Sequence, residues 1–355
     1  MPLDQNSAQP DIEAQLVDQE SLAQYLNEHL GEGELSIQRH SAGHSNETFF
    51  LKKGGRDLVL RRPPLAVYLP TAHDVLREYR VLSALQSTKV RVPRTVLSCE
   101  DESVIGAPFY LMEKVEGPVL RSELPEELRT SRSEIGRELV NALAELHAVD
   151  YEQVGLGGLG KAAGYLERQI KRWTGQLDLA TSITSTSREV PQMWEVRHWL
   201  AANVPESSRS TIVHGDYKLD NVVYGATSPA RLVAILDWEM CTLGDPLADL
   251  GWMISFWREA GDQEDPVFQG LSSVTAAQGF STRAELVQLY EELTGTQTES
   301  LTWYVVLAVW KLACLLEGSY GRHLLGTTDD PFFAQLEQGV PALARRALQV
   351  AEGGV

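Results

Sequence analysis

The stretch that decides the fold is residues 212–250, IVHGDYKLDNVVYGATSPARLVAILDWEMCTLGDPLADL. A strand-like run leads to the tripeptide HGD at residues 214–216, and four residues separate Asp216 from Asn221. A short hairpin then leads to a second apolar run that ends at Asp237. Because loops at strand ends bring side chains together at one edge of a small sheet, we expect these three polar residues to share one site.

Two carboxylates and one amide in this order suit phosphoryl transfer. One carboxylate orients the substrate hydroxyl, while the second carboxylate and the amide hold Mg²⁺ against the nucleotide phosphates. An aspartate of ordinary pKa is a weak base, but the transition state is loose, so positioning matters more than basicity. The alternative is that all three are turn or capping residues, which their joint spacing disfavours.

The motif HGD-x4-N, followed by DWE at residues 237–239, resembles the catalytic and magnesium loops of a known family. This family comprises the aminoglycoside phosphotransferase and choline kinase-like enzymes, which are relatives of the protein kinases. The resemblance implies that Asp216 is the catalytic base and that Asn221 and Asp237 are magnesium ligands. It covers residues 35–325 and implies ATP and Mg²⁺ as cofactors.

Three further residues of the same stretch have supporting roles by this resemblance. His214 is expected to be a scaffold for the loop rather than a base. Asp245 and Asp249 are expected to brace the loop from the following helix. Asp245 also suits the N-cap of that helix, because Pro246 behind it fits a first-turn position.

Two upstream segments resemble the nucleotide-binding parts of the family. Residues 43–48, GHSNET, occupy the place of the loop that covers the nucleotide, which implies that Ser45 and Asn46 contact it. Residues 109–117, FYLMEKVEG, resemble the hinge, where backbone groups from Glu113 to Val115 meet the adenine.

The strand expected at residues 57–62 departs from the family pattern. Its phosphate-binding position, usually lysine, carries Arg61, and Glu78 stands where the family has the glutamate that pairs with this lysine. Arginine keeps the charge and can bind phosphate in a bidentate manner. Arg62 and Lys52 are the alternatives if the strand register differs by one residue.

Two phrases, LVLRRPP and GYLERQIKRW, resemble the branch of the family found as a kinase-like domain fused to acyl-CoA dehydrogenases. In the second phrase Arg168, Lys171 and Arg172 lie on one helix face. This face is either solvated or binds an anionic part of the acceptor, which would make Arg168 and Arg172 substrate-binding residues. Trp252 is expected either to pack in the core or to form a wall of the acceptor pocket.

The order of expected elements predicts an α+β protein with a protein-kinase-like, two-lobed fold. A strand-rich N-terminal lobe (1–112) is followed by a hinge (113–117) and a mostly helical C-terminal lobe (118–355). The expected strands are 35–40, 48–53, 57–62, 95–99, 108–114, 210–214, 222–224 and 232–236. The expected helices are 12–30, 73–85, 133–149, 161–173, 193–203, 245–260, 281–294, 302–318 and 331–351.

The amino-acid composition restricts the classes of molecule that the protein is expected to bind. The chain has 355 residues, of which 43% are hydrophobic, and Lys+Arg 31 against Asp+Glu 49 gives a net charge of −18. Such acidity disfavours nucleic acid and anionic lipid but not ATP, which needs a few local cations and a metal. The three scattered cysteines form neither a disulfide framework nor a zinc motif. With an acidic, polar start, we expect a cytoplasmic protein without a membrane segment, either a monomer or a homodimer.

The sequence therefore predicts a kinase that phosphorylates a hydroxyl group of a small molecule. Protein substrates are disfavoured because GDPLADLG follows Asp237 almost at once and leaves no activation segment. The basic helix face favours an anionic, hydroxyacyl-type acceptor. The alternatives are an aminoglycoside or macrolide antibiotic kinase and, from another class, a catalytically silent nucleotide-binding module.

Overall fold

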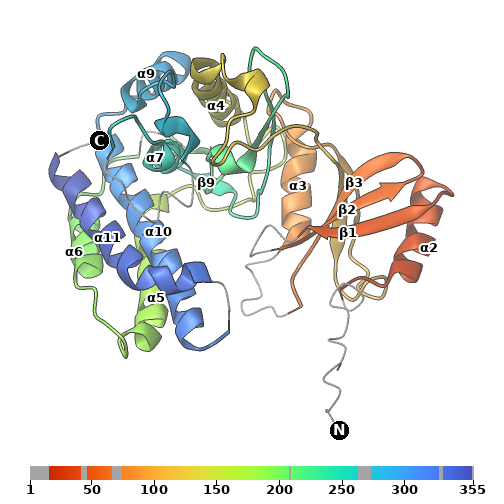
Figure 1. Cartoon of the computed structure of the whole chain (residues 1–355), viewed down its shortest axis with the longest axis horizontal. Helices are drawn as coiled ribbons and strands as arrows, with labels where there is room; N and C mark the ends of the chain where they lie inside the picture. The colour runs from red at the N-terminus through yellow and green to blue at the C-terminus, as the bar shows by residue number, and fades with distance from the viewer. Residues whose placement is uncertain are drawn as a thin grey trace, which may run out of the picture. The chain divides into compact units, whose positions relative to one another are not determined.

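The computed structural model describes residues 16–40, 46–65, 74–207, 209–262, 273–327 and 331–353. The chain divides into two compact units (Figure 1). Unit 1 comprises Met1–Thr88 and Val92–Glu116, and unit 2 comprises Lys89–Arg91 and Gly117–Val355. Unit 1 is built around a sheet and unit 2 is mostly helical, which confirms the predicted α+β class.

Unit 1 holds a five-stranded antiparallel sheet in the order β1-β2-β3-β5-β4. Every strand predicted in this region is present within one residue of its expected ends. The elements are α2 (Gln19–Leu30), β1 (Leu35–His40), β2 (Glu47–Lys53), β3 (Arg56–Arg62), α3 (Val75–Leu85), β4 (Thr95–Cys99) and β5 (Phe109–Glu113).

Alternation of side chains across the sheet gives unit 1 its core. Leu58 and Leu60 of β3 are fully buried together with Leu111 of β5, and Leu22 and Leu26 of α2 pack in the same cluster. Successive residues of a strand point to opposite faces, so Arg61 lies on the other face of the sheet from this cluster. The register Thr48↔Arg61 places these two residues side by side.

Unit 2 is helical apart from two small sheets, β6-β9 and β7-β8. Its helices are α4 (Arg132–His147), α5 (Tyr165–Thr184), α6 (Gln192–Ala202), α7 (Leu247–Phe256), α9 (Arg283–Thr294), α10 (Leu301–Leu324) and α11 (Pro331–Gly353). Its strands are β6 (Thr211–Val213), β7 (Val222–Tyr224), β8 (Leu232–Ile235) and β9 (Thr242–Gly244), and short 3-10 turns lie at Glu126–Leu128, Leu219–Asn221 and Val274–Ala276.

Several local predictions in unit 2 were wrong, among them the end of α10, which lies six residues beyond the predicted residue 318. Strand β9 was not predicted; its three residues form a strand because they pair with β6. Helix α5 continues eleven residues beyond the predicted end, since Leu177 and Ala180 prolong its buried stripe past Gly175. Helix α7 ends at Phe256 instead of residue 260, because tertiary hydrogen bonds hold the following backbone in an extended form.

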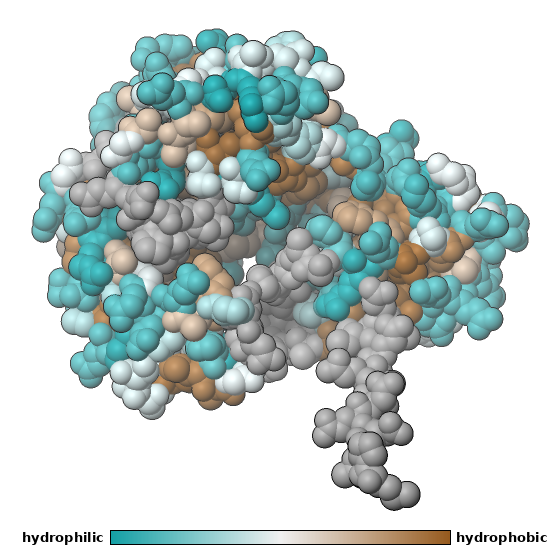
Figure 2. Space-filling view, in the orientation of Figure 1, coloured by the Kyte–Doolittle hydropathy of each residue, from teal (hydrophilic) through white to brown (hydrophobic). Residues whose placement is uncertain are grey.

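Helix α10 is the longest helix of the described chain, and it is strongly apolar. By length and composition it could span a membrane, yet 78% of its most apolar 18-residue segment is buried inside the protein. Figure 1 shows it running beside α5 and α11, and its closest packing is against α11, α5 and α7. It therefore has the contacts of a core helix, while the visible surface in Figure 2 is mostly hydrophilic with separate apolar patches.

A buried ion pair ties three helices of unit 2 together. Glu317 of α10 is 1% exposed, and Arg188, which follows α5, contacts both of its carboxylate oxygens at 2.9 and 2.8 Å. Arg188 also donates to the carbonyls of Leu336 and Glu337 in α11 and lies 4.5 Å from the ring centre of Tyr320.

Replacing Arg188 by methionine should lower the free energy of unfolding by about 3–5 kcal/mol, because it leaves the Glu317 carboxylate buried and unpaired. Urea denaturation measures this loss. The control is Arg129→Met, which removes an exposed pair with Glu126 and should change stability by no more than about 0.5 kcal/mol. Equal losses in the two variants would contradict the importance of the buried pair.

Candidate active site

The loop that carries Asp216 is fixed by its own backbone and by His214. Gly215 has φ +86°, and a Cβ at this position would lie 2.7 Å from the Met240 carbonyl, so only glycine fits. The Asp216 N–H donates to Nδ1 of His214, which places the ring proton on Nε2, and Nε2 donates to the Leu236 carbonyl at 2.9 Å. His214 thus holds the loop in place, as the resemblance implied.

Asp249 of α7 braces the same loop. Its carboxylate accepts hydrogen bonds from the backbone N–H groups of His214 at 2.6 Å and Gly215 at 2.8 Å. His147 at the end of α4 lies 3.3 Å from the same carboxylate and 2.7 Å from the Tyr290 hydroxyl. All of these side chains are buried, so the loop rests on a polar network that connects α4, α7 and α9.

Asp245 has the second predicted role, at the start of α7. Its Oδ1 accepts from the Leu247 N–H at 2.9 Å, which caps the helix, and its Oδ2 accepts from Ser207 at 2.6 Å. It is 2% exposed. The structure therefore gives capping to Asp245 and direct contact with the loop to Asp249.

Three side chains converge on the Asp216 carboxylate. Lys218 Nζ lies 2.9 and 3.1 Å from its two oxygens, Asn221 Nδ2 donates to Oδ2 at 2.7 Å, and the Trp252 indole donates to Oδ1 at 2.7 Å. Each carboxylate oxygen thus accepts two hydrogen bonds, which is its full capacity. Trp252 is thus more than a core residue, because its polar edge holds the predicted base.

Electrostatics keep Asp216 ionised. Burial alone would raise its pKa, but the ammonium groups of Lys218 and Lys311 outweigh burial and hold the pKa below its usual value. For Lys218, burial opposes the charged form, while Asp216 raises the pKa above its usual value. Asp216 therefore remains an anion that accepts hydrogen bonds across the neutral pH range.

Lys218 and Lys311 are the site residues that sequence reasoning missed. Lys218 stands two residues after Asp216, and that spacing was the available signal. Lys311 lies 95 positions after Asp216, in α10. In the sequence it is only the residue that follows an apolar run. Its Nζ donates to the Gly215 carbonyl and lies 4.0 Å from the ring centre of Trp252. No spacing rule connects it to the loop.

Asp237 is held beside Asn221 by the residue that precedes it. The Leu236 N–H donates to the Asn221 carbonyl at 2.8 Å, and its own carbonyl accepts from His214. Among the described residues Asp237 is the one non-glycine residue with positive φ, at 64°. Such backbone conformations are uncommon and gather at functional sites, where they aim a side chain.

The oxygen donors near Asp237 suit magnesium. Asn221 uses its Nδ2 for Asp216, and within the described ranges no hydrogen bond uses its Oδ1. Asp220 Oδ1 is buried and has no hydrogen-bond partner in the described part of the chain. There is also no group of three or more His, Cys, Asp or Glu residues there that would form a closed cage. A few oxygens with open positions are typical of Mg²⁺, which keeps waters and binds substrate phosphates.

In unit 1 the structure brings Arg61 and Glu78 together. Arg61 Nη2 lies 3.5 Å from Glu78 Oε2, and Nη1 donates to Thr48 at 3.1 Å. Arg62 points to the opposite face, where it donates to backbone carbonyls, and Lys52 pairs with Asp57 at the surface. In the observed strand register, Arg61 is therefore the residue that faces Glu78.

The other nucleotide-binding predictions remain predictions. Asn46 is buried directly before β2, and Ser45 lies outside the described residues. In the expected hinge, the Glu113 N–H donates to the Arg94 carbonyl. The Val115 N–H makes no hydrogen bond with any described residue.

The basic face of α5 divides between two tasks. Arg168 donates to the carbonyls of Lys161 and Ala163, so its guanidinium ties the preceding loop to the helix. Arg172 lies 5.2 Å from the Trp173 ring centre and is close enough to Lys311 to lower its pKa. Of the two predicted acceptor residues, Arg172 is thus the one within electrostatic range of the Asp216 region.

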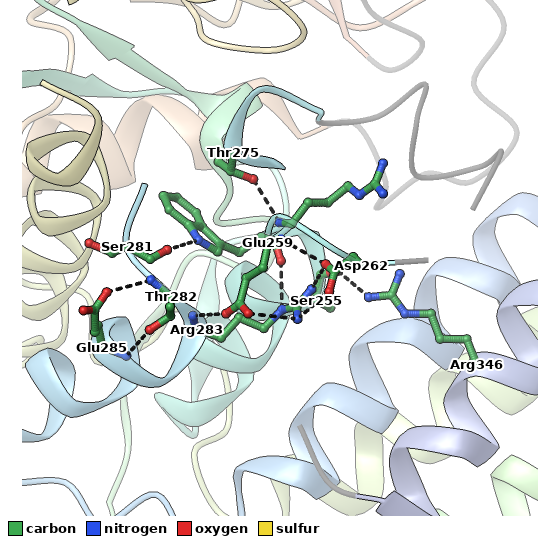
Figure 3. Close-up of polar contacts among 11 residues, drawn as sticks. Ser255, Glu259, Asp262, Thr275, Ser281, Thr282, Arg283, Glu285 and Arg346 are labelled. Carbon is green, nitrogen blue, oxygen red and sulfur yellow. Dashed lines mark hydrogen bonds and ion pairs between the residues drawn. The ribbon is translucent and has the colours of Figure 1, made fainter. Parts of the chain in front are cut away.

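The backbone that follows α7 is anchored by a polar network around Arg283 (Figure 3). Arg283 donates to Asp262 at 3.1 Å and to the Trp257 carbonyl at 2.9 Å, and the Glu259 N–H donates to Asp262 at 3.0 Å. Burial would raise the pKa of Asp262, but Arg283 lowers it overall. Arg346 adds a contact with the carbonyl of Ser255, so α7, which carries Trp252, is held at its C-terminal end.

Comparison with known proteins identifies the family to which the chain is similar. Residues 36–285 match the model of the phosphotransferase enzyme family. Acyl-CoA dehydrogenase family member 11 of Homo sapiens is 36% identical over 350 residues, which cover 94% of this chain and 43% of that protein. Family member 10 of Mus musculus is 32% identical over 317 residues, covering 87% of this chain and 29% of that protein. The chain thus spans less than half the length of these relatives.

Solved structures share the fold. A Ralstonia eutropha JMP134 protein named after the aminoglycoside phosphotransferases is 35% identical, with a TM-score of 0.79 over 95% of this chain and 98% of that one. Choline kinase from Cryptosporidium parvum Iowa II is 10% identical, with a TM-score of 0.66 over 95% of this chain and 97% of that one. The protein-kinase-like fold predicted from the sequence is thereby confirmed.

Proposed function

The chain belongs to the phosphotransferase enzyme family, and on that premise we propose that it transfers the γ-phosphate of ATP to a hydroxyl group of a small molecule. The acceptor that we propose is an anionic hydroxyacyl compound, either a hydroxy acid or its CoA thioester. Asp216 orients the acceptor hydroxyl and accepts its proton as the new phosphate ester forms.

To bind the acceptor hydroxyl, the Asp216 carboxylate must give up one of the hydrogen bonds that it accepts in the structure. Lys218 shares its ammonium between both carboxylate oxygens, whereas Asn221 and Trp252 each make a single directed bond. The acceptor hydroxyl replaces the Lys218 contact most easily, because the flexible lysine stem can turn while the other two donors keep the carboxylate oriented. Most of the rate enhancement then comes from position.

Asn221 and Asp237 are the residues that hold Mg²⁺ in this proposal, and the buried Asp220 oxygen is a further donor nearby. When bound, the metal supplies positive charge to the phosphate oxygens of the nucleotide. In unit 1, Arg61 supplies a further cation for the phosphates, and Glu78 holds its guanidinium in place.

The observation that carries the choice of acceptor is the charge around Asp216. Although the chain has a net charge of −18, Lys218 and Lys311 both act on this carboxylate, and Arg172 acts on Lys311. These three cations repel a polycationic aminoglycoside and attract an anion, although the carboxylates of Asp220, Asp237 and Asp249 act on the same two lysines. The names of the longer relatives, which are acyl-CoA dehydrogenase family members, also favour an acyl-CoA type of acceptor.

A coupled assay of ADP release tests the proposal. We expect turnover that requires Mg²⁺, stops with EDTA and is highest with hydroxyacyl-CoAs or hydroxy acids in a panel that also contains amino sugars and macrolides. Turnover with aminoglycosides or macrolides alone would favour an antibiotic kinase, in line with the name of the Ralstonia protein. Nucleotide binding without turnover on any acceptor would favour the silent module.

A further inference from the structure

Lys311 is a charged residue in the middle of the long apolar helix α10. It lies in α10 between Trp310 and Leu312, and 9% of its surface is exposed. Removing an ammonium group from water is costly unless it gains partners of opposite charge. A buried ammonium at this position therefore needs partners that compensate for the loss of water.

The contacts of Lys311 meet this need in part. Nζ donates to the Gly215 carbonyl and lies 4.0 Å from the ring centre of Trp252 and 5.5 Å from that of Trp173. An ammonium group has three donors, and within the described residues Gly215 is its one hydrogen-bond acceptor. No carboxylate oxygen of a described residue lies within 4.0 Å of Nζ.

Charged groups face Lys311 from each neighbouring element. Asp216 and Asp249 favour its charged form, whereas Arg172 and Lys218 oppose it. Burial outweighs the two carboxylates and lowers the pKa of Lys311 to about 8. At neutral pH the ammonium is therefore charged for the most part and short of anionic partners.

Trp252 connects Lys311 to the predicted base. The face of its indole ring lies against the Lys311 ammonium, and its Nε1 donates to Asp216 at 2.7 Å. A small cavity of about 20 Å³ borders Lys311, Trp252, Gly215 and Gln169, enough for one oxygen-sized group. Trp252 lines this cavity and also donates to Asp216, so a group bound beside Lys311 would lie one side chain away from the predicted base.

We propose that Lys311 determines acceptor specificity by binding the carboxylate or thioester oxygen of the acceptor, while Asp216 orients the hydroxyl. This inference rests on the proposed function and names the residue that selects the acyl end. The same contact excludes cationic acceptors, because the internal ammonium already covers the aromatic faces of Trp252 and Trp173 that would attract them.

Isothermal titration calorimetry without nucleotide tests the inference apart from catalysis. The probes are 4-hydroxybutyrate, which presents a carboxylate, and 4-hydroxybutyryl-CoA, which presents a thioester carbonyl. Lys311→Met keeps the length of the stem and should weaken binding of the better probe at least tenfold. The control is Lys89→Met, a change at an exposed residue of unit 2 outside the proposed site, which should leave the affinity unchanged. The probe that loses affinity identifies the oxygen that is bound.

The wild-type protein gives a second readout that needs no variant. Between pH 7 and pH 9 the ammonium loses its proton, so the affinity of the free protein for the probe should fall about tenfold. In Lys311→Met this dependence should disappear. Binding that is independent of pH in the wild type would overturn the inference.

Two other outcomes would also overturn it. One is a wild-type protein that binds neither probe, and the other is a Lys311→Met variant with unchanged affinity. A structural role would instead lower kcat for every acceptor and leave acceptor KM unchanged, whereas the proposed role raises acceptor KM with ATP KM unchanged. Failure of the proposed function is distinguishable, since it would show as probe binding without ADP release.

Discussion

Replacing Asp216 by asparagine should reduce phosphoryl transfer by about 10²–10⁴-fold while nucleotide binding is retained. The amide keeps the shape of the side chain and can still contact Trp252 or Asn221, but it has no charge to accept the acceptor proton. Lys218, with 17% of its side chain exposed, can turn toward solvent when its partner is lost. Steady-state assays of ADP release measure the rate, and calorimetry with ATP measures binding.

The matched control for this prediction is Asp178→Asn, a change of the same chemistry at an exposed position of α5 in the same unit. It should leave both rate and nucleotide affinity unchanged. Because Lys218 and Lys311 hold the pKa of Asp216 below its usual value, the wild-type rate should show no acid limb from this group between about pH 5 and pH 8. Turnover in Asp216→Asn equal to the wild type would contradict the mechanism.

Replacing Asp249 by alanine should cost both stability and activity. The change leaves the N–H groups of His214 and Gly215 without an acceptor in the interior, and it removes one of the two partners of His147. Each buried donor left unsatisfied costs about 1–3 kcal/mol, so the two backbone groups predict a loss of about 2–6 kcal/mol in the free energy of unfolding. Urea denaturation measures this quantity.

Activity separates the role of Asp249 from that of Asp216. Asp249 does not touch the proposed reacting groups, yet the Asp216 loop depends on it, so kcat in the variant should fall at temperatures where the protein is still folded. Asp178→Ala serves as the control and should affect neither quantity. A stable Asp249→Ala variant with a reduced rate would restrict Asp249 to positioning, and a variant with normal stability and rate would refute the brace.

The local sequence was sufficient for the catalytic loop because its parts are close together along the chain. Asp216, Asn221 and Asp237 lie within 22 positions, and the hydrogen bonds that join them, through Leu236 and His214, are made inside this same stretch. The strands of unit 1 were also predictable, since the alternation of apolar and polar residues sets which face each side chain takes.

The neighbourhood of Asp216 was not predictable in the same way. The sequence predicted for Trp252 only that it packs in the core or lines a pocket. It predicted no role for Lys311, which simply follows an apolar run. Trp252 lies in α7 and Lys311 in α10, two helices that pack against each other, and α10 also packs against α5. The rotation of a helix about its axis decides whether a side chain meets the site, and periodicity does not specify the partner that it meets.

By itself, the sequence determined the family, the fold class and the residues predicted to orient the hydroxyl and hold the metal, because loop motifs and alternation are local properties. The tertiary structure alone decided which cations surround Asp216, which of Arg61 and Arg62 faces Glu78, and where α5 and α7 end. Those features depend on groups far apart in the chain, whose burial and charge act on one another only after the helices have packed.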